Sequence, residues 1–188
     1  VAINWVGGGG DNNWSTGANW DPSITDPNGC ALYYDNGVAV DVAKLSATLD
    51  RDYTVTSMRL NNLSARTDIV DPNGSRLYTF EVPEGITLTV SGAVTVGHDA
   101  VALRNRYAVT GAFTGGGEMV INGPVTIRNT GNSWGSSSVT APATLDVSGL
   151  SKFTIDTTGD IELGGKNVGW GELILSPDNL LRAGNILV

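Results

Sequence analysis

Two stretches of this chain decide its fold: Leu88-Thr-Val-Ser-Gly-Ala-Val-Thr-Val96 and Met119-Val-Ile-Asn-Gly-Pro-Val-Thr-Ile127. Each begins with two apolar residues separated by one other residue, followed by a short polar residue and a glycine. Alternation with a period of two is typical of a β-strand that buries one face. A short polar residue with glycine is typical of a sharp turn. Both stretches therefore predict strands that end at a tight corner.

The same pattern recurs along the chain at a nearly regular spacing. Its six copies begin at Leu32, Met58, Leu88, Met119, Leu145 and Leu173. A repeat of about 30 residues with internal alternation is typical of a β-solenoid. We predict an all-β fold, a right-handed parallel β-helix of about six rungs, in which the first and third residues of the copies form two continuous apolar ladders. The fourth residues, such as Asp35, are expected to form turns. The alternative, an antiparallel β-sandwich, fits the steady period less well.

Residues 1–31 precede the first copy and are predicted to form an N-terminal cap rich in tryptophan and glycine. Trp5, Trp14 and Trp20 lie close together in this segment, and we expect them to be buried over the first rung, with nearby Asn and Asp side chains bonding their N–H groups. A cap is required because the open edge of a first rung pairs with other chains.

The rungs are expected to occupy residues 32–188 as a single domain. Because the last copy begins at Leu173, the sequence suggests a rung that is incomplete at Val188, truncated at the C-terminus, with further rungs of the same polypeptide as its partner. Surface loops are expected at 104–107, 129–138 and 164–171.

The N-terminal region resembles a known family. The residues that carry the resemblance are Trp5-Val-Gly-Gly-Gly-Gly-Asp-Asn-Asn-Trp-Ser-Thr-Gly-Ala-Asn-Trp-Asp21, then Leu32-Tyr-Tyr-Asp-Asn-Gly37, then the segment Leu49–Val55. Over residues 5–63 the chain is similar to secreted bacterial proteins that carry autotransporter-associated β-strand repeats. The resemblance implies a right-handed parallel β-helix, export, and a surface or extracellular location. That family has no shared catalytic residues, so the resemblance implies none here.

Charge and composition restrict the partners. The formal net charge is −8, and residues 1–43 contain no Lys or Arg but five aspartates: Asp11, Asp21, Asp26, Asp35 and Asp41. Such a surface repels phosphate backbones and anionic lipid, so we expect no nucleic acid partner and no membrane insertion. The single cysteine, Cys30, excludes an internal disulfide framework. This composition suits a bacterial protein that is secreted or displayed at the cell surface.

The sequence contains few candidates for catalysis. His98 is the only histidine, and the Gly-His-Gly and Arg-x-Pro-x-x-Arg elements that pectin-degrading β-helix enzymes use are missing. Three carboxylate pairs have the residue types needed for glycoside hydrolysis, but each is interpreted as solvated charge near a turn. These pairs are Asp50 with Asp52, Glu81 with Glu84, and Asp156 with Asp160. We therefore predict neither an enzyme nor a cofactor.

Two binding chemistries stay open. A structural calcium ion could use the oxygen-rich residues Asp11, Asn12, Asn13, Asp21, Asp26 and Asp35, although no calcium-loop spacing occurs. Carbohydrate contact is the second, because Trp134 and Trp170 lie in segments rich in Gly, Ser and Asn and would stack on sugar rings if exposed. Extracellular polysaccharide is the partner that exposed rings would take; the other interpretation is that each tryptophan folds back over a rung.

These observations predict a non-catalytic structural or adhesive β-helix module of an exported bacterial protein. The alternative is a carbohydrate-binding accessory module of a polysaccharide-degrading enzyme. A fragment of a β-helix polysaccharide lyase or hydrolase is a third hypothesis.

Overall fold

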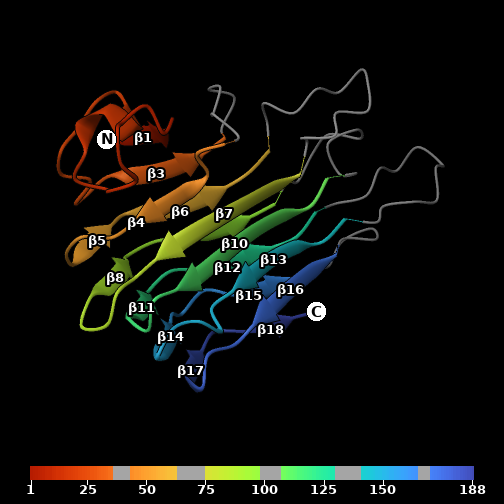
Figure 1. Cartoon of the computed structure of the whole chain (residues 1–188). Coiled ribbons are helices and arrows are strands. Elements are labelled where there is room, and N and C mark those ends of the chain that lie inside the picture. The colour runs from red at the N-terminus through yellow and green to blue at the C-terminus, as the bar shows by residue number, and fades with distance from the viewer. Residues whose placement is uncertain (36–42, 63–74, 98–106, 130–140, 165–169) are drawn as a thin grey trace.

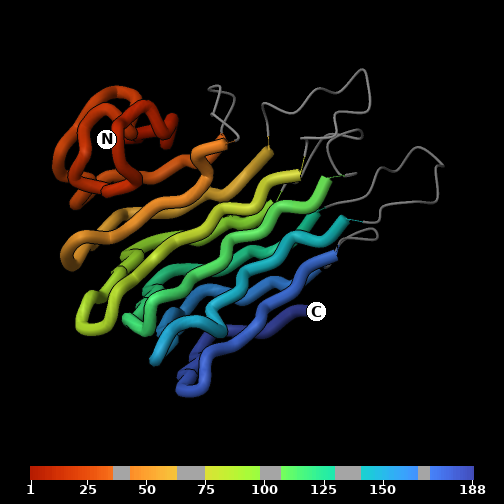
Figure 2. The backbone as a smooth tube through the Cα atoms, viewed as in Figure 1, coloured from red at the N-terminus to blue at the C-terminus, as the bar shows by residue number. Residues whose placement is uncertain are grey.

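The computed structural model describes residues 1–35, 43–62, 75–97, 107–129, 141–164 and 170–188, which form a parallel β-solenoid of about four turns. Three sheets run along the solenoid (Figure 1). The turns are stacked from the N-terminal end, in red, to the C-terminal end, in blue (Figure 2). The predicted all-β fold with parallel stacking is confirmed, but the expected number of about six rungs is too high.

Sheet A has eight strands, in the order β18-β15-β12-β9-β6-β3-β1-β2. These are β1 (Ala2–Trp5), β2 (Trp20–Asp21), β3 (Ala31–Tyr34), β6 (Ser57–Leu60), β9 (Val94–Val96), β12 (Val125–Ile127), β15 (Ile161–Leu163) and β18 (Ile186–Leu187). All neighbours in this sheet are parallel except β1 and β2, which are antiparallel.

Sheets B and C have five parallel strands each, in the orders β16-β13-β10-β7-β4 and β17-β14-β11-β8-β5. Sheet B consists of β4 (Ser46–Thr48), β7 (Arg76–Glu81), β10 (Val109–Thr114), β13 (Ala143–Asp146) and β16 (Gly171–Ile174). Sheet C consists of β5 (Tyr53–Val55), β8 (Thr87–Val90), β11 (Glu118–Ile121), β14 (Lys152–Asp156) and β17 (Asp178–Arg182). Among the described residues the one helical element is η1 (Gly17–Asn19).

Successive strands along the chain belong to sheets A, B and C in turn, and the connections at the three corners of a turn differ in length. The connections from sheet B to sheet C and from sheet C to sheet A are short; 82–86 and 147–151 are the longest of them. The connections from sheet A to sheet B are longer, the shortest being 164–170 and the longest 61–75 and 128–142. All the segments outside the described residues belong to these longer connections.

Alternation along the strands is as predicted. Leu88 and Val90 on β8, and Ile121 on β11, are fully buried, whereas Thr89 and Val120 between the buried positions are partly exposed. The residues that face the core are therefore readable from the period-two pattern.

The predicted register of the repeat is wrong. The first residues of the six copies fall on three sheets, two on each: Leu32 and Met58 in sheet A, Leu88 and Met119 in sheet C, Leu145 and Leu173 in sheet B. Two continuous ladders therefore do not form. The physical reason is that every turn has three strands with the same apolar alternation, so successive copies of the pattern need not belong to the same face.

The three N-terminal tryptophans are buried, as predicted, with exposed fractions of 2% or less. The N–H partners differ from the expectation: backbone carbonyls take the place of Asn and Asp side chains at Trp5 and Trp20, and Trp14 Nε1 is buried without a hydrogen-bond partner among the described residues. Trp5 Nε1 donates to the carbonyl of Lys44 (2.9 Å), and Trp20 Nε1 donates to the carbonyl of Trp14 (2.8 Å). The side chain of Asn19 instead binds the loop, accepting from the N–H of Gly9 and donating to two carbonyls.

Aromatic rings continue from this cluster into the core. Trp20 packs edge-on against Trp5 (5.1 Å between centroids) and against Tyr34 (6.1 Å). Tyr34 contacts Phe80 on β7, and Phe80 stacks on Phe113 on β10 at 4.6 Å. Aromatic pairs of this kind add about 0.5–1.5 kcal/mol beyond their buried area. The N-terminal segment is thus packed onto the first turns as part of one core.

These environments lead to a fluorescence prediction. In a Trp134→Phe background, the change Trp170→Phe should remove most of the emission that acrylamide quenches, because Trp5, Trp14 and Trp20 are buried and Trp170 is exposed. Stern–Volmer plots of the two proteins make the comparison. If strong quenching persists without Trp170, a tryptophan of the N-terminal cluster must be open to solvent.

Candidate functional site

Trp170 lies directly before β16, which is the strand that the last turn of the solenoid contributes to sheet B. An isolated antiparallel bridge joins its backbone to Asn129 through two hydrogen bonds of 3.2 Å. The N–H of Ala143 on β13 also donates to the Trp170 carbonyl (3.1 Å). The residue is nevertheless 53% exposed. A ring held on a fixed backbone and open to solvent is suited to stacking on a flat apolar surface of a ligand.

Glu172 provides a polar group beside this ring. It lies two positions further along the chain, on β16, and side-chain alternation places it on the same side as Trp170. Thr144 pairs with Glu172 in register and donates its hydroxyl to Glu172 Oε2 (3.2 Å). Thr144 is buried, whereas Glu172 is exposed. The indole can stack on a sugar ring while the carboxylate accepts hydrogen bonds from hydroxyl groups.

The buried residue Asn129 holds the backbone of Trp170 through the bridge between them. Asn129 is fully buried, and its Nδ2 donates to the carbonyls of Tyr107 (3.1 Å) and Ala141 (3.0 Å). The sequence predicted Asn129 as the first residue of a surface loop, and this is wrong. Asparagine is common both in loops and as a buried bridge between backbone groups, so composition alone does not separate the two roles.

Two candidates from the sequence, Trp134 and His98, lie outside the described residues. Trp170 is thus the member of the predicted carbohydrate-contact pair whose surroundings the structure describes.

Five of the six candidate carboxylates, all except Glu84, make contacts between or within turns in the described part of the chain. Asp52 Oδ1 accepts the N–H of Thr87 (2.8 Å), and Glu81 Oε2 accepts the hydroxyl of Thr48 (3.2 Å). Asp156 pairs with Arg182, and Asp160 accepts from Asn185 Nδ2 (2.8 Å).

Asp50 forms a hydrogen-bonded pair with Tyr53. Tyr53 donates its hydroxyl to Asp50 Oδ1 (2.7 Å). Burial raises the pKa of Asp50, but hydrogen bonds from Ser15 and Tyr53 outweigh it, so the pKa lies below the usual value. Burial and the bond to Asp50 together raise the pKa of Tyr53. The pair is thus a charged carboxylate bound to a neutral phenol.

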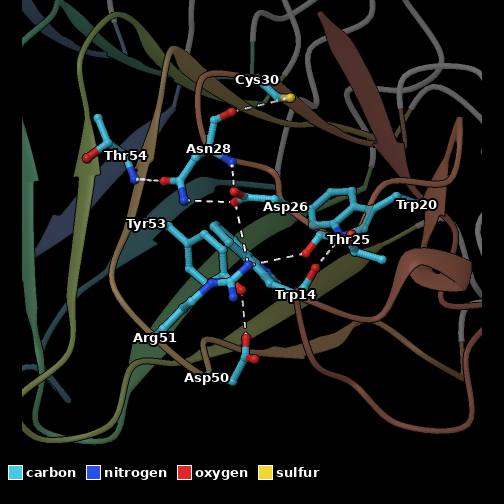
Figure 3. Close-up of polar contacts among 10 residues, drawn as sticks. All are labelled: Trp14, Trp20, Thr25, Asp26, Asn28, Cys30, Asp50, Arg51, Tyr53 and Thr54. Atoms are coloured by element: carbon cyan, nitrogen blue, oxygen red, sulfur yellow. Dashed lines mark hydrogen bonds and ion pairs between the residues drawn. The ribbon is translucent and has the colours of Figure 1, made fainter.

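A polar cluster joins the N-terminal segment to the first turns (Figure 3). Asp26 Oδ1 accepts from Asn28 Nδ2 (2.8 Å), and Asn28 Oδ1 accepts the N–H of Thr54 on β5 (2.6 Å). Arg51 Nη2 lies 3.6 Å from Asp26 Oδ1, and its guanidinium group sits 5.3 Å from the centre of the Tyr53 ring. These contacts fix the Asp26–Gly29 turn against the solenoid.

The oxygen-rich residues considered for calcium do not share one set of contacts: Asp11 contacts Asn13, whereas Asp26 and Asp35 each have a basic partner. Asp26 faces Arg51, and Asp35 forms a buried ion pair with Arg76. Asp11 Oδ1 accepts the N–H of Asn13 (3.0 Å); a hydrogen bond with the Thr16 side chain and this backbone bond lower its pKa. The described ranges contain no group of three or more His, Cys, Asp or Glu side chains that could hold a metal ion.

The ion pair between Asp35 and Arg76 is a feature that the sequence did not indicate. Arg76 Nε donates to Asp35 Oδ2 at 2.9 Å, and both side chains are almost fully buried. Beside it, Tyr78 donates its hydroxyl to the carbonyl of Asn61 (2.7 Å). Asp35 follows β3 and Arg76 begins β7, so the pair links the first turn to the second. Charges buried this deeply must be paired, which makes the link structural.

Comparisons with protein-family models, with curated proteins and with solved structures found no match for this chain.

Proposed function

We propose that this chain is a structural and adhesive β-solenoid module of an exported bacterial protein, without catalytic activity, that contacts extracellular polysaccharide through Trp170. The described part of the chain has no helix that is long and apolar enough to cross a membrane. The resemblance of residues 5–63 to exported proteins with β-strand repeats supports the location, and the solenoid supports the scaffold role.

The observation that carries the scaffold role is the use of charged side chains on the outer faces. Polar links connect successive turns on all three sheets. They include Arg128 to Glu162 (2.6 Å), Thr144 to Glu172 (3.2 Å) and Arg182 to Asp156 (3.4 Å). In a solenoid each turn is stabilised chiefly by its neighbours, so such links favour a stiff rod. A stiff rod is suited to holding a binding surface away from its point of attachment.

The observation that favours carbohydrate contact is the exposed Trp170 beside Glu172 on a fixed backbone. The net charge of −8 disfavours acidic polymers, so neutral polysaccharides are the expected ligands. This chemistry also fits the second candidate, an accessory module of a polysaccharide-degrading enzyme, because such a module needs the same stacking surface.

A glycan array with the purified chain tests the contact. We expect binding to neutral polysaccharides that weakens by about tenfold or more in Trp170→Ala, because loss of a central aromatic contact typically costs more than about 1 kcal/mol. Trp170→Phe should retain much of the binding. The matched control is Leu77→Ala, which removes an exposed apolar side chain from the same sheet. Equal binding by the parent and Trp170→Ala would remove Trp170 from the proposal.

Turnover assays test the absence of catalysis. The chain is incubated with polygalacturonate, alginate and the neutral glycans that bind, and new reducing ends and unsaturated products are followed. No turnover is expected. Turnover that co-purifies with the chain and disappears in Asp156→Asn or Asp50→Asn would overturn the scaffold proposal in favour of a lyase or hydrolase.

A further inference from the structure

The outer face of sheet B has acidic side chains and, among its described positions, no basic ones. Alternation along β4, β7, β10, β13 and β16 identifies the residues that point outward from this sheet. Three of them are carboxylates: Glu81, Asp146 and Glu172. The outer faces of sheets A and C differ, since they present Arg59 on β6, Lys152 on β14 and Arg182 on β17. Sheet B is therefore the face whose electric field favours a cationic ligand.

Glu172 is the carboxylate of this face that lies beside an aromatic ring. Residues two positions apart on a strand share a face and have Cα atoms about 6.6 Å apart, so Trp170 and Glu172 are neighbours on the outer side of the sheet. Both residues are exposed. Their side chains point away from the core, across the direction in which the turns stack, and a ligand that lies against the side of the rod can reach both.

One oxygen of the Glu172 carboxylate is held in place, and the other is open. Thr144 on the preceding turn donates its hydroxyl to Oε2 at 3.2 Å. Within the described part of the chain, Oε1 accepts no hydrogen bond and the carboxylate has no basic partner. The negative charge is thus positioned by Thr144 and available to a ligand.

An exposed indole beside an unpaired carboxylate has the chemistry that binds an ammonium group on a sugar ring. The apolar side of the sugar stacks on the indole. An ammonium group near the face of the indole is attracted by its quadrupole, and the carboxylate accepts a charge-assisted hydrogen bond from the same group. An acetamido group at that position has no charge, and a uronate is repelled. The pair Trp170 and Glu172 therefore discriminates between sugars by their charge.

We propose that Trp170 and Glu172 recognise amino sugars with free, protonated amines, so that the ligand is an extracellular polysaccharide of hexosamines that lack at least part of their N-acetyl groups. The assignment of Glu172 rests on the proposed contact of Trp170 with polysaccharide and names the ligand class of that same site. Glu172 selects amino over acetamido sugars. Thr144 is a positioning residue, because it is buried and acts through Glu172.

Isothermal titration calorimetry with two matched tetrasaccharides measures this selection. One is the β-1,4-linked tetramer of N-acetylglucosamine, and the other is the same tetramer with free amines, both slightly below neutral pH. The parent chain should bind the amino tetramer at least about fivefold more tightly. Added salt should reduce this preference, because the attraction is between exposed charges. Tetralysine, which has ammonium groups but no sugar ring, should bind at least about fivefold more weakly than the amino tetramer.

Variants of the carboxylate and its support form the second arm. Glu172→Gln removes the charge and keeps the size of the side chain, so it should bring the affinities for the two tetramers to within about twofold of each other. Binding of the acetylated tetramer should stay within about twofold of the parent. Thr144→Val removes the hydroxyl that holds the carboxylate and should lower the preference by about twofold or more, whereas Thr144→Ser should retain it.

Glu81→Gln is the matched control. Glu81 lies on the same face and accepts the hydroxyl of Thr48 at 3.2 Å, as Glu172 accepts that of Thr144. The outward residue two positions before it is Thr79 rather than a tryptophan. This variant loses the same charge and should keep the full preference for the amino tetramer.

Equal affinity of the parent for the two tetramers would overturn the assignment of an amino-sugar ligand. So would a preference that survives in Glu172→Gln or is lost in Glu81→Gln. Binding of tetralysine as tight as that of the amino tetramer would assign the face to a basic peptide instead. If neither tetramer nor any glycan of the array binds, or if Trp170→Ala binds both tetramers as the parent does, the proposed polysaccharide contact fails as well.

Discussion

Replacing Ile121 with aspartate should lower the free energy of unfolding by about 4 kcal/mol or more, because it places an unpaired charge in a close-packed interior. Ile121 lies on β11 between Val90 on β8 and Ile155 on β14, and all three residues are fully buried. Neither neighbouring strand offers a cation at this position. Urea denaturation followed by far-ultraviolet circular dichroism measures the loss.

The neighbouring residue is the matched control. Val120 is on the same strand, faces outward and is partly exposed, so Val120→Asp should change the stability by less than about 1 kcal/mol. The two variants have the same charge and differ only in the face that receives it. Equal destabilisation by both would contradict the alternation assigned to β11.

Removing one partner of the buried ion pair should have a comparable effect. Arg76→Met leaves Asp35 buried without its guanidinium partner, and breaking a buried pair in this way typically costs about 3–5 kcal/mol. Thermal and urea denaturation compare the variant with the parent. Arg182→Met is the matched surface control: it breaks the exposed contact with Asp156 and should cost less than about 1 kcal/mol.

A double variant separates lost charge pairing from lost packing. Asp35 has a φ of +55°, a backbone conformation that asparagine tolerates well, so Asp35→Asn removes the charge without straining the turn. Combined with Arg76→Met, it should recover much of the stability that the single change loses. A single Arg76→Met variant as stable as the parent would mean that Asp35 is stabilised by other groups.

The sequence predicts which residues face the core better than it predicts which strands lie side by side. Alternation identifies the buried positions because a strand turns successive side chains to opposite faces whatever its neighbours are. Which strands pair depends on the sheet to which the chain returns in the next turn, and the alternation of apolar residues does not contain that information. Met58, for example, pairs with Val94 rather than Leu88, and Leu88 lies between Tyr53 and Met119.

Some polar residues illustrate the same limit. Asp35 has the composition of a turn residue, and its positive φ agrees with that role. The sequence did not indicate that it is also the buried partner of Arg76, because the two residues are 41 positions apart. The candidate site was predictable only in part: a tryptophan among small polar residues indicated Trp170, whereas Thr144 meets Glu172 through strand pairing, which the sequence did not indicate.

The unequal corners have a consequence for how the chain can change in length. The connections from sheet A to sheet B vary widely, from the short 164–170 to the long 61–75, yet the strands on either side keep an unbroken register in all three sheets. The rise from one turn to the next is fixed by backbone hydrogen bonding between strands and does not depend on how much chain a turn contains. Residues gained or lost at this corner over evolutionary time would therefore alter one long side of the rod while its core remains the same. A designer could likewise graft peptides there, one per turn, in a row spaced by the distance between strands.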